Sequence, residues 1–115
     1  MQHADQLRIS TEHQGDTCVV SVAGEVDIAS APQLRTHVNA ALAAKPRRLV
    51  VDLSQTTYLD SSGIAELTRA GKALSGMGSS LVLFTGDSKV KKILDVLGLS
   101  RAFAPPEEGS QAPLR

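Results

Sequence analysis

Aromatic residues, cysteine and net charge are all scarce in this chain of 115 residues. Its only aromatic side chains are Tyr58, Phe84 and Phe103, so we expect an aliphatic core and no aromatic platform for stacking single-stranded nucleic acid. Twelve basic residues balance twelve acidic ones, which gives no electrostatic indication of a nucleic-acid or anionic-membrane partner. Cys18 is the single cysteine, which excludes an intrachain disulfide and a zinc site built from several thiolates.

Long apolar runs are also missing. The first ten residues, MQHADQLRIS, lack the apolar centre of a signal peptide, and no stretch approaches the roughly 20 apolar residues of a membrane span. We therefore expect a cytoplasmic protein with no direct contact to membrane or nucleic acid. The length suits one domain, and the apolar fraction of 42% suffices for a modest core.

Apolar periodicity predicts strands and helices in alternation. Strands are expected over residues 7–13, 17–22, 49–53 and 81–84, and helices over about 31–44, 62–75 and 90–97. A Gln14-Gly15-Asp16 turn joins the first two strands as a hairpin, and every later strand is followed by a helix. The order predicts a single α/β domain with a mixed, mostly parallel sheet and right-handed crossovers that bring the helices onto one face.

Capping and tail signals set the expected boundaries. Ser30-Ala31-Pro32-Gln33 matches a capping box, in which the Ser30 hydroxyl accepts a backbone amide while Gln33 reaches back. Gly98 fits the C-terminal cap of the third helix. The segment APPEEGSQAPLR carries three prolines and no apolar period, so we expect a folded domain over residues 1–103 and a flexible tail over 104–115.

Two acidic, hydroxyl-rich stretches follow neighbouring strands of the predicted sheet. AGEVD comes after Val22, and SQTTYLDSSG comes after Leu53. The carboxyl ends of parallel strands gather at one edge, where such folds place their sites. We therefore expect these two stretches to converge and to form the functional edge of the domain.

The paired serines in YLDSSG admit three roles: helix cap, nucleophile or phosphoacceptor. A nucleophile needs a neighbouring base, yet His3, His13 and His37 all fall away from the predicted edge, and no G-x-S-x-G motif occurs. Asp27 and Asp60 supply only two hard ligands, so no metal site is expected, and no cofactor motif is present. These observations disfavour an enzyme.

Capping and phosphate acceptance remain open at this point. Asp and Ser are both preferred N-cap residues, which accounts for one of these side chains but not for the doubled serine. A serine at a helix N-terminus also suits a phosphate, because free amides and the helix dipole favour negative charge there.

Gly24-Glu25-Val26-Asp27, followed by the capped helix and Tyr58-Leu59-Asp60-Ser61-Ser62-Gly63-Ile64, resembles the STAS domain of bacterial anti-sigma factor antagonists. The resemblance covers about residues 7–103. It implies that the unphosphorylated protein binds an anti-sigma factor with serine kinase activity and thereby frees a sigma factor for transcription. Phosphorylation by that kinase ends the complex, and a serine phosphatase reverses the mark. The chain would then be a substrate and not an enzyme, and a monomer when free.

The resemblance also implies roles for individual residues. The phosphoacceptor is the serine directly after the motif aspartate, Ser61, and Asp27 would orient its hydroxyl across the edge. The partner-binding residues would be Gly24, Glu25, Asp27, Asp60, Ser62, Gly63 and Ile64. Related STAS domains serve instead as accessory subunits of transport ATPases or of larger signalling assemblies, and this is the alternative function.

Overall fold

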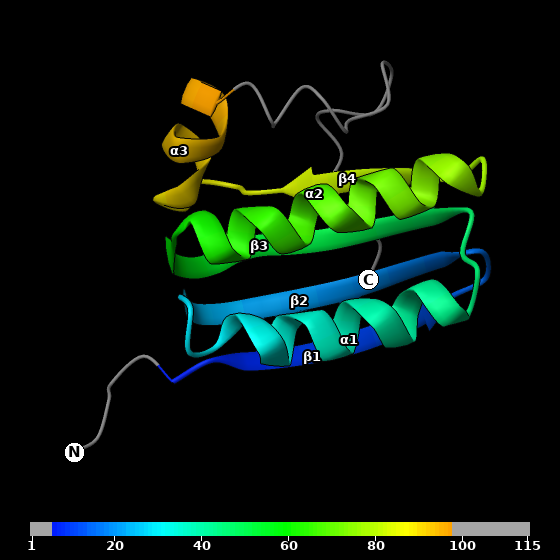
Figure 1. Ribbon diagram of the computed structural model, residues 1–115, viewed down its shortest axis with the longest axis horizontal. Coiled ribbons are helices and arrows are strands. Elements are labelled where there is room, and N and C mark those ends of the chain that lie inside the picture. Colours follow the sequence, from blue (N-terminus) through cyan, green and yellow to red (C-terminus); the bar gives the residue numbers. More distant parts are fainter. Residues whose placement is uncertain (1–5, 98–115) are drawn as a thin grey trace.

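The computed structural model describes residues 6–97 and contains the predicted order of strands and helices (Figure 1). The elements are β1 (Arg8–Gln14), β2 (Thr17–Val26), α1 (Ala31–Ala43), β3 (Arg48–Leu59), α2 (Ser61–Gly76), β4 (Ser80–Phe84) and α3 (Val90–Leu97). Gly15 lies in the β1–β2 turn with a φ of 59°, a left-handed conformation that glycine adopts without steric cost.

The four strands form one sheet in the order β1-β2-β3-β4. β1 and β2 pair antiparallel, as expected of a hairpin, while β2–β3 and β3–β4 pair parallel. One transverse row joins Cys18, Leu49 and Leu81, so the three parallel strands start in step. The predicted mixed, mostly parallel sheet is confirmed.

All three helices contribute to one apolar core on a single face of the sheet. In Figure 1, α1 lies over β1 and β2 while α2 lies over β3 and β4. The core contains alternate residues of β2, β3 and β4 and the inner stripe of each helix, with Ile9 of β1 packed against it. Within residues 6–97 none of the buried hydrophobic residues is aromatic. Its main members are Cys18, Val20, Val22, Leu49, Val51 and Leu53 from the sheet and Leu34, Val38, Leu67, Leu74, Val90 and Leu94 from the helices. Both the aliphatic core and the placement of the helices are confirmed.

The other face of the sheet carries a smaller apolar cluster. Val19, Val50 and Val82 are buried there, with Phe84 packed against them. β3 is therefore apolar on both sides over Leu49–Leu53, as its sequence predicts. Asp52 interrupts this run as a buried carboxylate whose Oδ1 accepts hydrogen bonds from the Ser54 amide and hydroxyl, which offset the cost of its burial.

β2 and β3 are both longer than their apolar patterns predict. β2 continues through AGEV to Val26, and β3 continues through SQTTYL to Leu59, so most of the two stretches expected to follow these strands is itself strand. The extensions pair with each other across two register shifts, at Ser21/Ala23 and Gly24/Glu25. Such bulges break the two-residue alternation on which the strand prediction depends.

Several predictions fall on residues outside the described range. They are the Gly98 cap, the position of His3, the domain boundary at Phe103 and the tail over 104–115. Within residues 6–97, no helix combines the length and apolarity needed to cross a membrane.

Candidate functional site

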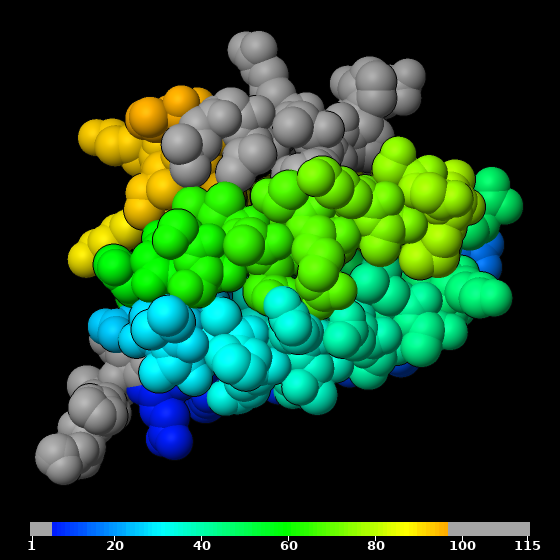
Figure 2. All heavy atoms as spheres, viewed as in Figure 1, coloured from blue at the N-terminus to red at the C-terminus, as the bar shows by residue number. Residues whose placement is uncertain are grey.

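The carboxyl ends of β2 and β3 bring the two predicted stretches together. Glu25 pairs with Tyr58 and Val26 with Leu59, and the Asp60 amide donates to the Val26 carbonyl at 3.2 Å. α1 and α2 begin directly beyond these strand ends, and their first turns lie next to one another at the left of the molecule in Figure 2, cyan and green respectively. The predicted convergence is confirmed.

Gly24 is buried inside β2 and shapes the backbone at this edge. Its φ of 111° lies in a region open to glycine, and it stands at the second register shift between β2 and β3. At the first shift the Thr56 hydroxyl, also buried, donates to the Val22 carbonyl at 2.8 Å. The two register shifts bend the end of β2, where Glu25 is exposed. Gly24 is itself buried and contributes to this edge through its backbone conformation.

Asp27 closes the loop between β2 and α1. Its Oδ1 accepts hydrogen bonds from the amides of Ala29 and Ser30, each at 3.0 Å, and lies 3.0 Å from the Ser30 hydroxyl. The backbone amide of Ser30, then its hydroxyl, lowers the pKa of Asp27 below its usual value. The described hydrogen bonds of this carboxylate thus stay within its own loop. The expectation that Asp27 orients Ser61 stays a prediction.

The predicted capping box at α1 is wrong. Ser30 occupies the N-cap position, but its hydroxyl makes no capping bond to the helix. It accepts from the Asp27 amide at 2.9 Å and lies within 3.0 Å of the Glu25 carbonyl, while Gln33 reaches Leu7. The Ser30 oxygen accepts from the Asp27 amide in place of a first-turn amide of α1, and the Asp27 carboxylate already accepts from the Ser30 amide that Gln33 would otherwise reach.

Asp60 caps α2, one of the two capping positions that the sequence allowed. It has an extended backbone, and its Oδ1 accepts from the Ser62 amide at 2.9 Å. Ser61 is the first helical residue and is exposed, whereas Ser62 is half-buried. Within residues 6–97 no hydrogen bond engages the Ser61 hydroxyl. The geometry leaves this hydroxyl accessible to a second protein at a helix N-terminus.

Gly63 and Ile64 face inward more than expected. Gly63 is buried, and a Cβ on it would collide with Leu59 Cδ1 and lie 2.8 Å from Val26 Cγ1. Its small size is therefore required where α2 crosses the strand ends. Ile64 is half-buried against the core. Of the predicted partner-binding residues, Glu25 is exposed, and Asp27, Asp60, Ser62 and Ile64 are partly exposed.

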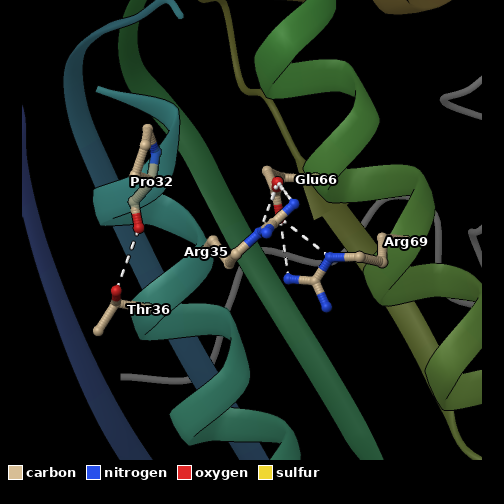
Figure 3. A network of polar contacts seen from close by, with 5 residues as sticks. All are labelled: Pro32, Arg35, Thr36, Glu66 and Arg69. Carbon is tan, nitrogen blue, oxygen red and sulfur yellow. Dashed lines mark hydrogen bonds and ion pairs between the residues drawn. The ribbon is translucent and has the colours of Figure 1, made fainter. Parts of the chain in front are cut away.

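The sequence analysis missed a charged cluster one turn into α2. Figure 3 shows Arg35 of α1 and Arg69 of α2 converging on Glu66. Arg35 Nη2 lies 3.0 Å from Glu66 Oε2, and Arg69 Nη2 lies 2.8 Å from Oε1. Burial alone would raise the pKa of Glu66, but hydrogen bonds from both arginines outweigh it and hold the pKa below its usual value. The spacing Glu66-x-x-Arg69 was the available signal.

The structure gives little support to a histidine-activated serine or to a metal site at this edge. His13 pairs with Cys18, near the start of β2 and hence at the opposite end of the sheet from Ser61. Among residues 6–97, no three His, Cys, Asp or Glu side chains are grouped so that they could hold a metal ion. The edge offers an exposed hydroxyl, a capped helix and carboxylates, a set suited to modification and to protein binding.

Comparison with known proteins identifies the class. The family model described as Mlab, STAS domain, matches residues 9–105, so the chain belongs to the STAS domain family. The anti-sigma-B factor antagonist of Listeria monocytogenes is 30% identical over 89 residues, which are 77% of this chain and 78% of that protein.

Solved structures point to the same group. An anti-sigma factor antagonist from Mycobacterium paratuberculosis matches with a TM-score of 0.74 and 30% identity, over 90% of this chain and 87% of that one. The antagonist SpoIIAA, in its unphosphorylated form, matches with a TM-score of 0.71 at 20% identity, over 82% and 84% of the two chains, and shares the fold. The relatives are thus regulatory proteins named as anti-sigma factor antagonists.

Proposed function

We propose that this chain is an anti-sigma factor antagonist that binds an anti-sigma factor with serine kinase activity and so frees a sigma factor in the bacterial cytoplasm. Phosphorylation of Ser61 switches this binding off, and a serine phosphatase restores it. The observation that carries the proposal is the position of Ser61: exposed, first in α2, and directly after the capping Asp60. The names of the relatives support the general role.

The switch follows from electrostatics. A phosphoserine carries about −1.5 to −2 charge at neutral pH. At this edge it would join Glu25, Asp27 and Asp60, which line the ends of β2 and β3. A partner that covers Ser61 would have to desolvate this charge. An uncompensated buried charge costs about 3–5 kcal/mol, which weakens binding by a factor on the order of hundreds to thousands.

The chain acts as the substrate of the transfer. The Ser61 hydroxyl oxygen forms a bond to the γ-phosphorus of ATP held by the partner, the bond to the ADP oxygen breaks, and the hydroxyl proton passes to a base of the kinase. Free amides in the first turn of α2 favour the resulting phosphate. SpoIIAA, which shares this fold at 19% identity and a TM-score of 0.66, has also been solved in a phosphorylated form.

The test combines phosphorylation with binding. Purified candidate anti-sigma kinases are incubated with the chain and ATP, and intact mass is measured for the wild type, Ser61→Ala and Ser62→Ala. We expect one phosphate on the wild type and on Ser62→Ala and none on Ser61→Ala. In a binding assay, Ser61→Asp should weaken the complex, whereas Ser61→Ala should bind about as tightly as the wild type.

Three outcomes contradict the proposal. A phosphate retained by Ser61→Ala places the acceptor elsewhere, and full-strength binding by Ser61→Asp refutes the charge switch. Purification of the tagged chain with a transport ATPase and no kinase would favour an accessory subunit, the alternative that the resemblance allows.

A further inference from the structure

Ile28 is held at the surface by a rigid loop. Its side chain is 78% exposed, although it lies within the turn that Asp27 closes through the amides of Ala29 and Ser30. The Asp27 carbonyl also accepts from the Ala31 amide at 2.7 Å, which connects the turn to α1. A loop whose backbone is fixed in this way loses little conformational entropy when a partner covers it.

A groove runs from Ile28 between the first turns of α1 and α2. Ala31 and Pro32 line it on the α1 side, and Ala65 lines it on the α2 side, so its walls are mainly apolar. Ser62 also lines the groove, which therefore opens directly beside the proposed acceptor. Figure 2 shows the two helices in contact along this seam.

The groove also reaches the charged cluster. Arg35 and Glu66 complete its lining, and Arg69 binds the second oxygen of Glu66. Two guanidinium groups share one carboxylate, which leaves one positive charge in excess. The side chains of Arg35 and Arg69 are 57% and 38% exposed and that of Glu66 only 8%, so both arginines present charge to solvent, and Arg35 is the one that lines the groove.

We propose that this groove binds an aliphatic side chain and a neighbouring carboxylate of the anti-sigma factor, with Ile28 as the apolar contact and Arg35 as the cationic contact. The inference rests on the proposed function and adds which chemical groups of the anti-sigma factor would bind at the same edge. Charge complementarity supports it, since the acidic residues of the edge do not line the groove and Arg35 presents a positive charge within it that attracts a single carboxylate. It also strengthens the switch, because a phosphate on Ser61 would repel the same carboxylate.

The test measures the affinity of the anti-sigma kinase that phosphorylates the chain for four single variants. Ile28→Ala should raise Kd about tenfold or more, because the lost methylene groups no longer become buried. Arg35→Gln should raise Kd several-fold at low salt, with a shallower salt dependence than the wild type. Val96→Ala is the apolar control, since Val96 of α3 is 79% exposed. Lys91→Gln, also on α3, is the cationic control, since its side chain is 54% exposed and paired with Asp95.

The outcomes separate this inference from the proposed function. Arg35→Lys keeps the charge and should retain most of the affinity if the attraction is electrostatic. If Ile28→Ala and Arg35→Gln bind as tightly as their controls while Ser61→Asp binds weakly, the groove is not the contact and the function stands. If the wild type binds no anti-sigma factor, both fall. Thermal unfolding of each variant shows whether a lost affinity merely reflects a lost fold.

Discussion

The two helices that meet at the candidate functional edge start with the same kinds of residue but use them in opposite ways. At α1, Asp27 and Ser30 bond to each other and to their own loop, so the polar groups are consumed within a closed turn. At α2, Asp60 caps the helix through the Ser62 amide and leaves Ser61 exposed at the first helical position. The polar groups before α1 thus fix their own loop, whereas the start of α2 presents a hydroxyl group to solvent.

The two starts also differ in how they are anchored. The start of α1 is fixed by hydrogen bonds of the loop before it, which include the bond from the Ala31 amide to the Asp27 carbonyl. α2 is held by close packing, because Gly63 sits against Leu59 and Val26 at the ends of β3 and β2. The start of α2 is thus held by packing although Ser61 itself is exposed, which suits the role of phosphoacceptor proposed for Ser61.

The packing at Gly63 gives the largest expected effect on stability. Gly63→Ala should lower the free energy of unfolding by about 1–3 kcal/mol, since the added Cβ overlaps the side chains of Leu59 and Val26. Urea denaturation measures the change. Gly76→Ala is the matched control in the same helix, where nothing lies within 4 Å of the new Cβ. It should be neutral or stabilising by up to about 1 kcal/mol. Equal losses at both positions would show that α2 is not anchored at Gly63.

The N-cap of α2 gives the next largest expected effect on stability. Asp60→Ala should cost about 1 kcal/mol, because the Ser62 amide loses its acceptor, and thermal unfolding should show a lowered Tm. Asp60→Asn should keep most of the stability, since Asn caps about as well as Asp. If Asn and Ala cost the same, the charge near the helix dipole matters and the capping geometry does not, and the contrast between the two helix starts disappears.

Much of this fold is predictable because its core pattern is regular. Leu49–Leu53 reads as a strand buried on both faces, and Leu34 and Val38 mark the inner face of α1. The convergence of the two polar stretches follows from the parallel order of β2 and β3 alone. Residue preference also predicts a cap at Asp60 or Ser61, and the structure has it at Asp60.

What could not be predicted depends on contacts between distant residues. The bulges that extend β2 and β3 need Gly24 and the Thr56 hydroxyl in register, which no local pattern reports. The inward position of Gly63 depends on the side chain of Leu59 from the preceding strand. The capping box predicts the wrong donor for the Ser30 oxygen, because the sequence signal is the same whether or not the Asp27 amide and carboxylate are close enough to bond to Ser30.

The ion pairs of Glu66 with Arg35 and Arg69, which link α1 and α2, give the smallest expected effect on stability. This effect depends on pH. The pKa of Glu66 is lowered in the folded protein, so its ion pairs stabilise the fold above the pKa of the unfolded chain, near 4.5, and this stabilisation is lost as the pH falls through the lower folded value. At pH 7, Glu66→Gln should cost no more than about 1 kcal/mol, because water screens the half-exposed arginines. In urea denaturation between pH 7 and pH 3, the gap between the wild type and Glu66→Gln should close below about pH 4.5, while Glu12→Gln on exposed β1 controls for the loss of one carboxylate. A gap that stays constant down to pH 3 would mean that packing of the side chain, and not its charge, joins α1 to α2.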